Sequence, residues 1–205
     1  MTAATEQMRR ELAAAAARLI ADGGLDYAGA KRKAARQLLG DGVAATRAAM
    51  PDNDAIDAAL LEHLSLFDEA HDARVARRRE VAVELMEMLA EYDPYATGAV
   101  WKGIVAEHAP IHLQLFHDDT KDVEIRLLNL GINYEVETTT HFKARGRDAR
   151  DDVEAIVFWW RNEPVMLSLY RHDDLRGALR AGVLGPERGD LSALRQRMHD
   201  HEAGQ

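Results

Sequence analysis

The chain of 205 residues contains no cysteine, which excludes disulfides, thiolate metal sites and a cysteine nucleophile. Long apolar runs are also missing, since no stretch approaches the roughly 20 residues that span a bilayer. Charged residues interrupt the early segment RELAAAAARLI (10–20), so it lacks the uncharged apolar core of a secretory signal. We therefore expect a cytoplasmic protein with no membrane partner.

Positive charge is the scarcer sign, with 26 lysines and arginines against 35 acidic residues and a formal net charge of -9. This balance argues against nonspecific nucleic-acid binding by the whole chain, because backbone phosphates require compensating cations. Basic residues nevertheless gather on the expected second helix, at Lys31, Arg32, Lys33 and Arg36. They would contact DNA or a partner protein, or form the solvated face of an amphipathic helix. The solvated face is favoured because no recognition-like helix follows closely.

Hydrophobic residues make up 47% of the chain and charged residues 30%, which is typical of a protein that buries a sizeable core. Apolar residues recur at helical spacing in segments of the first half, at about 5–22, 27–39, 52–67 and 73–92. The second half changes to strand-like alternation. We therefore predict an α+β protein, with a helical N-terminal region at 1–92 and an α/β domain at 93–205.

The expected elements of the second half are a short strand at 95–100 that runs into Gly98, a helix or turn at 101–107, strands at 111–116 and 132–140, and a hairpin at 153–170. In the strand 111–116, His112 and Gln114 fall on one side and apolar residues on the other. Glu154 shares a strand face with hydrophobic residues, where a carboxylate is unexpected.

The order strand, glycine turn, short helix, strand, helix, strand between Pro94 and Tyr170 resembles the nucleotidyltransferase (polymerase-beta-like) superfamily. Gly98-Ala99 resembles the glycine turn of that family, and Gly103 stands near its second small residue. His112-Leu113-Gln114 occupies the place of the acid-x-acid pair. The string AEHAPIHLQLFHDDTKDVEIRLLNLG is similar to uncharacterised bacterial nucleotidyltransferase-domain proteins, some of which are labelled UDP-N-acetylmuramate–alanine ligase.

The resemblance implies a mixed sheet flanked by helices, a nucleotide or nucleic-acid end as ligand, and Mg²⁺ or Mn²⁺ only if the protein is catalytically active. The implied catalytic residues are His112, Gln114 and Glu154, with Glu137 as the alternative third acid. The implied nucleotide- or phosphate-binding residues are Gly98, Ala99, Lys102, Gly103 and Lys143.

Histidine and glutamine at the places of the two acids argue against standard metal-dependent transfer. Two-metal catalysis needs hard anionic oxygen ligands, and a neutral imidazole with a neutral amide removes about two negative charges from the site. If activity survives, His112 would act as a general base or bind a softer metal. ATP-dependent ligation is not expected, because no glycine-rich loop ends in Gly-Lys-Ser or Gly-Lys-Thr.

Other kinds of site receive less support. His108, His112 and His117 would suit a transition metal, but only His112 lies within the predicted strand. No serine stands in a Gly-x-Ser-x-Gly elbow. Two hypotheses of function therefore remain: a diverged nucleotide- or nucleic-acid-binding protein with catalysis in doubt, and a noncatalytic DNA- or protein-interaction module that uses the basic helix 27–39.

Overall fold

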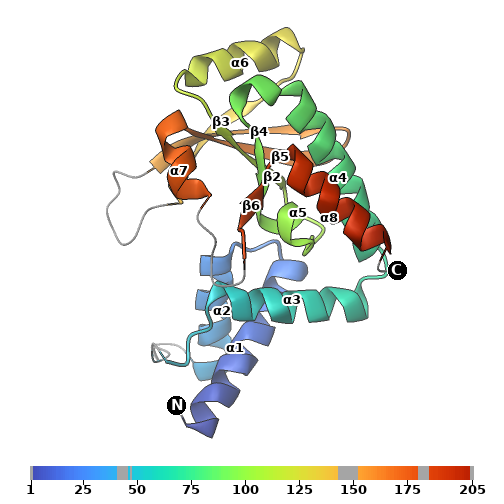
Figure 1. Ribbon diagram of the computed structural model, residues 1–205. Helices are drawn as coiled ribbons and strands as arrows, with labels where there is room; N and C mark the ends of the chain where they lie inside the picture. Colours follow the sequence, from blue (N-terminus) through green and yellow to red (C-terminus); the bar gives the residue numbers. More distant parts are fainter. Residues whose placement is uncertain (1, 41–45, 47, 143–151, 180–184, 204–205) are drawn as a thin grey trace. The chain divides into compact units, whose positions relative to one another are not determined.

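The computed structural model describes residues 2–40, 46, 48–142, 152–179 and 185–203. These residues confirm the α+β class, with helices and a six-stranded mixed sheet (Figure 1). None of the described helices is both long and apolar enough to cross a membrane. The chain divides into two compact units: unit 1 comprises 1–74 and 104–109, and unit 2 comprises 75–103 and 110–205.

Unit 1 is built from three amphipathic helices, α1 (Ala3–Ala21), α2 (Tyr27–Leu39) and α3 (Asn53–Phe67). Each helix begins after a side chain that accepts a backbone N–H of the first turn, from Thr2, Asp26 and Asp52 respectively. Small buried alanines let α1 and α2 approach closely, and Ile56, Leu60 and Leu64 of α3 complete their core.

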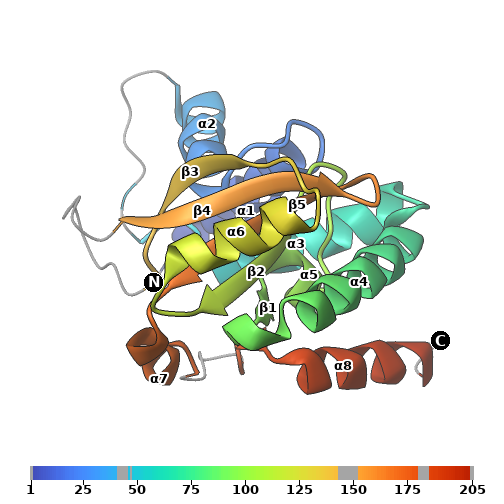
Figure 2. The same ribbon diagram turned by 90° about the horizontal axis from the view of Figure 1, so that it is seen from above.

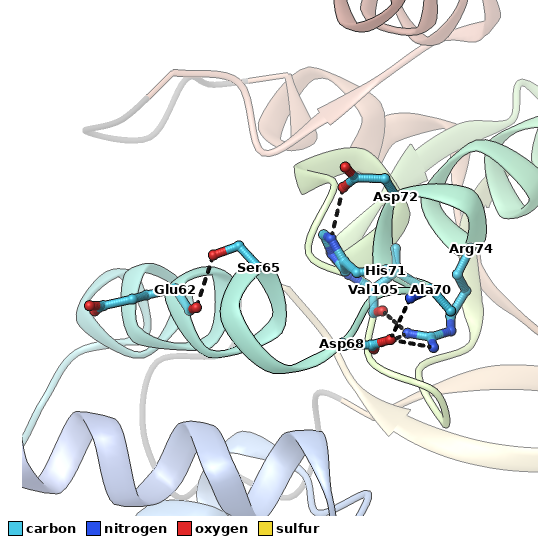
Figure 3. Close-up of polar contacts among 8 residues, drawn as sticks. All are labelled: Glu62, Ser65, Asp68, Ala70, His71, Asp72, Arg74 and Val105. Carbon is cyan, nitrogen blue, oxygen red and sulfur yellow. Dashed lines mark hydrogen bonds and ion pairs between the residues drawn. The ribbon is translucent and has the colours of Figure 1, made fainter. Parts of the chain in front are cut away.

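The segment 104–109 belongs to unit 1 and is held there by polar contacts (Figure 3). Arg74 Nη1 donates to Asp68 Oδ2 at 2.7 Å and to the carbonyl of Val105 at 3.0 Å. The N–H of Val105 donates to Nε2 of the buried His71 at 3.4 Å. His71 Nδ1 lies 3.2 Å from Asp72 Oδ1, so a neutral ring protonated at Nδ1 satisfies both partners. The hydrogen bond from Arg74 lowers the pKa of Asp68.

Unit 2 contains residues 75–88 of α4 (His71–Met88) and the whole sheet. The elements that follow α4 are the 3₁₀ turn η1 (Ala90–Tyr92), β1 (Tyr95–Thr97), α5 (Gly98–Lys102), β2 (Ile111–Phe116), α6 (Thr120–Asn129), β3 (Glu135–Thr140), β4 (Asp152–Trp160), β5 (Glu163–Tyr170), η2 (His172–Asp174), α7 (Leu175–Ala178), β6 (Arg188–Gly189) and α8 (Leu191–Ala203).

The strand order is β3-β4-β5-β2-β1-β6, and only the β2–β5 pair is parallel among the described strands. Apolar residues of α4, α6 and α8 pack on one face of this sheet, against Ile111, Leu113 and Leu115 of β2. We call it the core face. The views agree that α4 and α6 lie on the same side of the strands (Figure 1, Figure 2).

Three predicted boundaries are wrong. The strand expected at 95–100 ends at Thr97, because Gly98 adopts φ 62° and opens α5. The strand expected from Ile132 begins at Glu135, since the N–H of Ile132 donates to the carbonyl of Leu127 behind α6. The helix expected at 73–92 ends at Met88 and continues as a 3₁₀ turn. The strand predicted at 111–116 is confirmed with both ends correct.

Candidate functional site

The face of the sheet opposite the core face carries the polar side chains of β2. Thr97 of β1 pairs with His112 on one side and with Arg188 of β6 on the other, and Gln114 pairs with Ser168 of β5. Residues opposite one another in neighbouring strands point to the same face. We call this the polar face, and its five central residues are Thr97, His112, Gln114, Ser168 and Arg188.

His112 is held by a hydrogen bond to a fully buried partner. Its Nε2 lies 2.8 Å from Ser168 Oγ, and Ser168 has no exposed surface. Gly98 lies beside the ring, since a Cβ at that position would be 3.8 Å from His112 Nδ1. Burial, followed by the positive charge of Arg188, lowers the pKa of His112 from 6.5 to about 4. His112 is therefore neutral at pH 7.

The distance between Ser168 and His112 is that of a nucleophile and its base. A nucleophile must reach the substrate, however, and the side chain of Ser168 is completely enclosed. The pair therefore orients His112 rather than forming a hydrolytic site.

Arg188 is the only cation among the five central residues of the polar face. It is 7% exposed, and its Nη1 donates to Oε1 of the buried Gln114 at 2.5 Å. Glu187, whose side chain is 62% exposed, lies 3.5 Å from Nη2. The Nε atom of Arg188 is buried and has no hydrogen-bond partner among the described residues. Burial lowers the pKa of Arg188, yet a guanidinium remains charged at pH 7.

An aromatic wall borders this guanidinium. The Phe142 ring centroid lies 4.6 Å from Arg188 Cζ, and Phe142 packs edge-on against Tyr170. Tyr170 in turn stacks on Phe116, with ring centroids 5.5 Å apart. Burial raises the pKa of Tyr170, so its hydroxyl stays neutral. Apolar surroundings lower the local dielectric and strengthen the field of Arg188.

The register separates the candidate third acids from His112 and Gln114. Ala155 shares the polar face, so Glu154 points to the opposite face, where its Oε1 is buried without a described hydrogen-bond partner. Glu137 lies on the polar face but three strands away from Gln114, roughly 14 Å at normal strand spacing. Neither carboxylate therefore lies close to His112 and Gln114.

The implied phosphate-binding residues are divided between α5 and segments that the structure does not describe. Gly98 lies beside His112, whereas the carbonyl of Ala99 accepts the N–H of Gly103 at 2.8 Å to close α5. Lys102 is exposed in the last turn of that helix. Lys143 lies outside the described residues. Within the described ranges, no three histidine or acidic side chains gather in a way that could hold a metal ion, and His108 belongs to unit 1.

The basic residues of the second helix lie on α2, as the sequence predicts. Arg32 and Lys33 are exposed, Arg36 is exposed in the last turn, and Lys31 Nζ donates to Asn53 Oδ1 at 2.8 Å. The helix carries no acidic residue. Its exposed surface therefore carries positive charge without an acidic residue of its own.

Sequence reasoning missed Arg188, whose positive charge acts on His112. The strand that holds Arg188 has only two residues, so no alternation marks it as part of the sheet. The polar face combines a buried cation, a neutral imidazole and a neutral amide, a combination that suits an anion. No family model, no curated protein and no solved structure matches this chain, so the geometry of the polar face is the basis for assigning a function.

Proposed function

We propose that unit 2 binds the phosphate of a nucleotide, or of a nucleic-acid end, on the polar face, and that it does so without metal-dependent transfer chemistry. Arg188 is the anion-binding residue of this proposal. The observation that carries it is the buried guanidinium whose Nε has no described partner and whose carboxylate neighbour is largely exposed to solvent.

Burying a cation without a matched counter-ion is costly, and a bound anion removes that cost. A guanidinium suits phosphate in particular, because its planar donors pair with two phosphate oxygens at once. Nε and one Nη form one such edge. In Arg188 the hydrogen bond to Gln114 fixes the group through Nη1, Nη2 lies 3.5 Å from the exposed Glu187, and Nε has no described partner. Because Nε is buried, a bound phosphate must displace the side chains that cover it.

The same positive field opposes a divalent metal. Burial, followed by the charge of Arg188, lowers the pKa of His112, so a further positive charge near this ring is disfavoured. A Mg²⁺ ion at the place of the family's acid pair would meet this repulsion without the carboxylates that normally offset it. The replacement of both acids and the presence of Arg188 therefore support one proposal, in which His112 is a neutral partner for the ligand and not a metal ligand.

Isothermal calorimetry with ATP tests the proposal, in EDTA and in Mg²⁺. We expect ATP to bind in EDTA, with an affinity that Mg²⁺ does not increase. Arg188→Met should lower this affinity at least tenfold, and Arg188→Lys should lower it less. Arg195→Met is the matched control, because Arg195 lies in the same unit and forms an ion pair with Glu87 in which both side chains are about half exposed. Circular dichroism checks that each variant is folded. Binding that requires Mg²⁺, or that Arg188→Met leaves unchanged, refutes the proposal.

A second candidate function rests on the acid-free, exposed basic surface of α2 in unit 1. We propose it as a contact to DNA phosphates, independent of unit 2. Fluorescence anisotropy with duplex DNA should then show affinity that falls steeply with salt and is lost in Lys31→Glu/Arg32→Glu. Equal binding by this variant and the unmodified chain would exclude α2 as the contact.

A further inference from the structure

Strand β3 forms one edge of the sheet and is solvated along its length. In the part of the chain that the structure describes, it pairs with β4 and with no other strand. All of its residues are exposed except Thr139, and Val136 is 51% exposed. Such an edge presents unpaired backbone N–H and C=O groups, which can pair with an added strand.

A groove of about 770 Å³ lies beside this edge, within unit 2. Glu135 and Glu137 line it from β3, both on the polar face and both exposed. Val157 and Met166 contribute apolar surface from β4 and β5, and Trp159 is 71% exposed. The exposed indole of Trp159 and the two carboxylates together line the groove.

The charge of the groove selects its occupant. Two carboxylates at alternate positions lie roughly 7 Å apart along a strand, which is the repeat of same-face side chains in an added strand. Cations in such a strand would stand opposite the carboxylates, and an exposed indole attracts the same cations through its π-face. We propose that the β3 edge binds an extended peptide segment of a partner protein that carries lysine or arginine at alternate positions.

Other occupants fit less well. A second copy of this chain pairing edge to edge through β3 would bring like charges together, which is destabilising. Nucleic acid would place its phosphates against Glu135 and Glu137. The groove extends to Met166, which pairs with His112, but the carboxylates that select the peptide lie three strands from His112 and from the phosphate site proposed above. Either proposal can therefore fail without the other.

Fluorescence anisotropy tests the inference with a labelled ten-residue peptide that alternates lysine and threonine. We expect saturable binding to the full chain, at least tenfold weaker binding to Glu135→Lys/Glu137→Lys, and at least threefold weaker binding to Trp159→Ala. Glu62→Lys/Glu69→Lys is the matched control, since it makes the same charge change at exposed residues of unit 1. Its affinity should stay within about twofold of the unmodified chain. A peptide with N-methyl groups on alternate amides should bind at least tenfold more weakly, because it cannot complete the strand ladder.

Each opposite result overturns the inference. The groove does not select the peptide if the unmodified chain fails to bind it. The same conclusion follows if Glu135→Lys/Glu137→Lys and the control Glu62→Lys/Glu69→Lys lose equal affinity for the peptide. Equal binding of the N-methylated peptide would exclude strand addition. Binding of a single-stranded oligonucleotide that depends on Trp159, or self-association that depends on Glu135 and Glu137, would assign the groove to another occupant.

Discussion

The pH dependence of stability gives a direct test of the environment of His112. The perturbation is His112→Gln, which removes the titrating ring and keeps a polar side chain beside Ser168. A pKa lowered from 6.5 to about 4 means that the folded protein disfavours the protonated ring. The corresponding free energy is about 3 kcal/mol.

The sign follows from proton binding in the two states. Between pH 6.5 and pH 4 the unfolded chain protonates His112 while the folded chain does not, so stability falls as the pH is lowered through this window. Above pH 6.5 the ring is neutral in both states and contributes nothing to the pH dependence. Below about pH 4 the ring is protonated in both states, and the loss reaches its full value.

Urea unfolding of the unmodified chain and of His112→Gln, from pH 7.5 to pH 3.5, measures this effect. The difference in unfolding free energy between the two proteins should shift by about 3 kcal/mol in favour of the variant as the pH falls. Contributions from other titrating groups are shared by the two proteins and cancel. A difference that stays constant within about 0.5 kcal/mol would refute the desolvated, electropositive environment assigned to His112.

Two further predictions concern the packing of each unit. A Cβ at Gly189 would overlap the ring of the buried Trp101, so Gly189→Ala should lower the unfolding free energy by about 1–3 kcal/mol in thermal melts. This loss of stability should be smaller in a Trp101→Phe background. An unchanged loss there would exclude the indole ring as its cause. Tyr27 donates a hydrogen bond to the buried Asp57, and burial and that bond raise the pKa of Tyr27. Tyr27→Phe should therefore cost about 1–3 kcal/mol in urea unfolding, and a cost near zero would show that the hydroxyl has no structural role.

Elements with a strong local signal could be predicted from the sequence. Strict alternation gave β2 with both ends correct, because its two faces meet different surroundings, a packed core and a polar face. Helix α2 was predicted at 27–39 from its helical apolar spacing and from Gly40 after its last residue, and the structure shows that Asp26 also caps its first turn. These signals are local, because each can be recognised within one short segment of the sequence.

The composition of the site depends on pairing between distant segments. Arg188 lies two strands from His112 on the same face because β6 pairs with β1, and a two-residue strand carries no periodic pattern. The alternation within β4 correctly placed Glu154 among hydrophobic residues. It could not tell which of the two sheet faces they occupy. That choice is made by the register between β4, β5 and β2, and it separates Glu154 from His112 and Gln114.

The central claim is that Arg188 binds phosphate through Nε, which has no hydrogen-bond partner among the described residues. It is tested most directly by NMR of the arginine Nε–H signals during titration with ATP in EDTA, with Arg188→Lys to assign the resonance. We expect the Arg188 signal to move and saturate with the affinity found by calorimetry, with Mg²⁺ adding nothing. An Arg188 signal that stays in place while others respond, or a response that appears only with Mg²⁺, would contradict the claim.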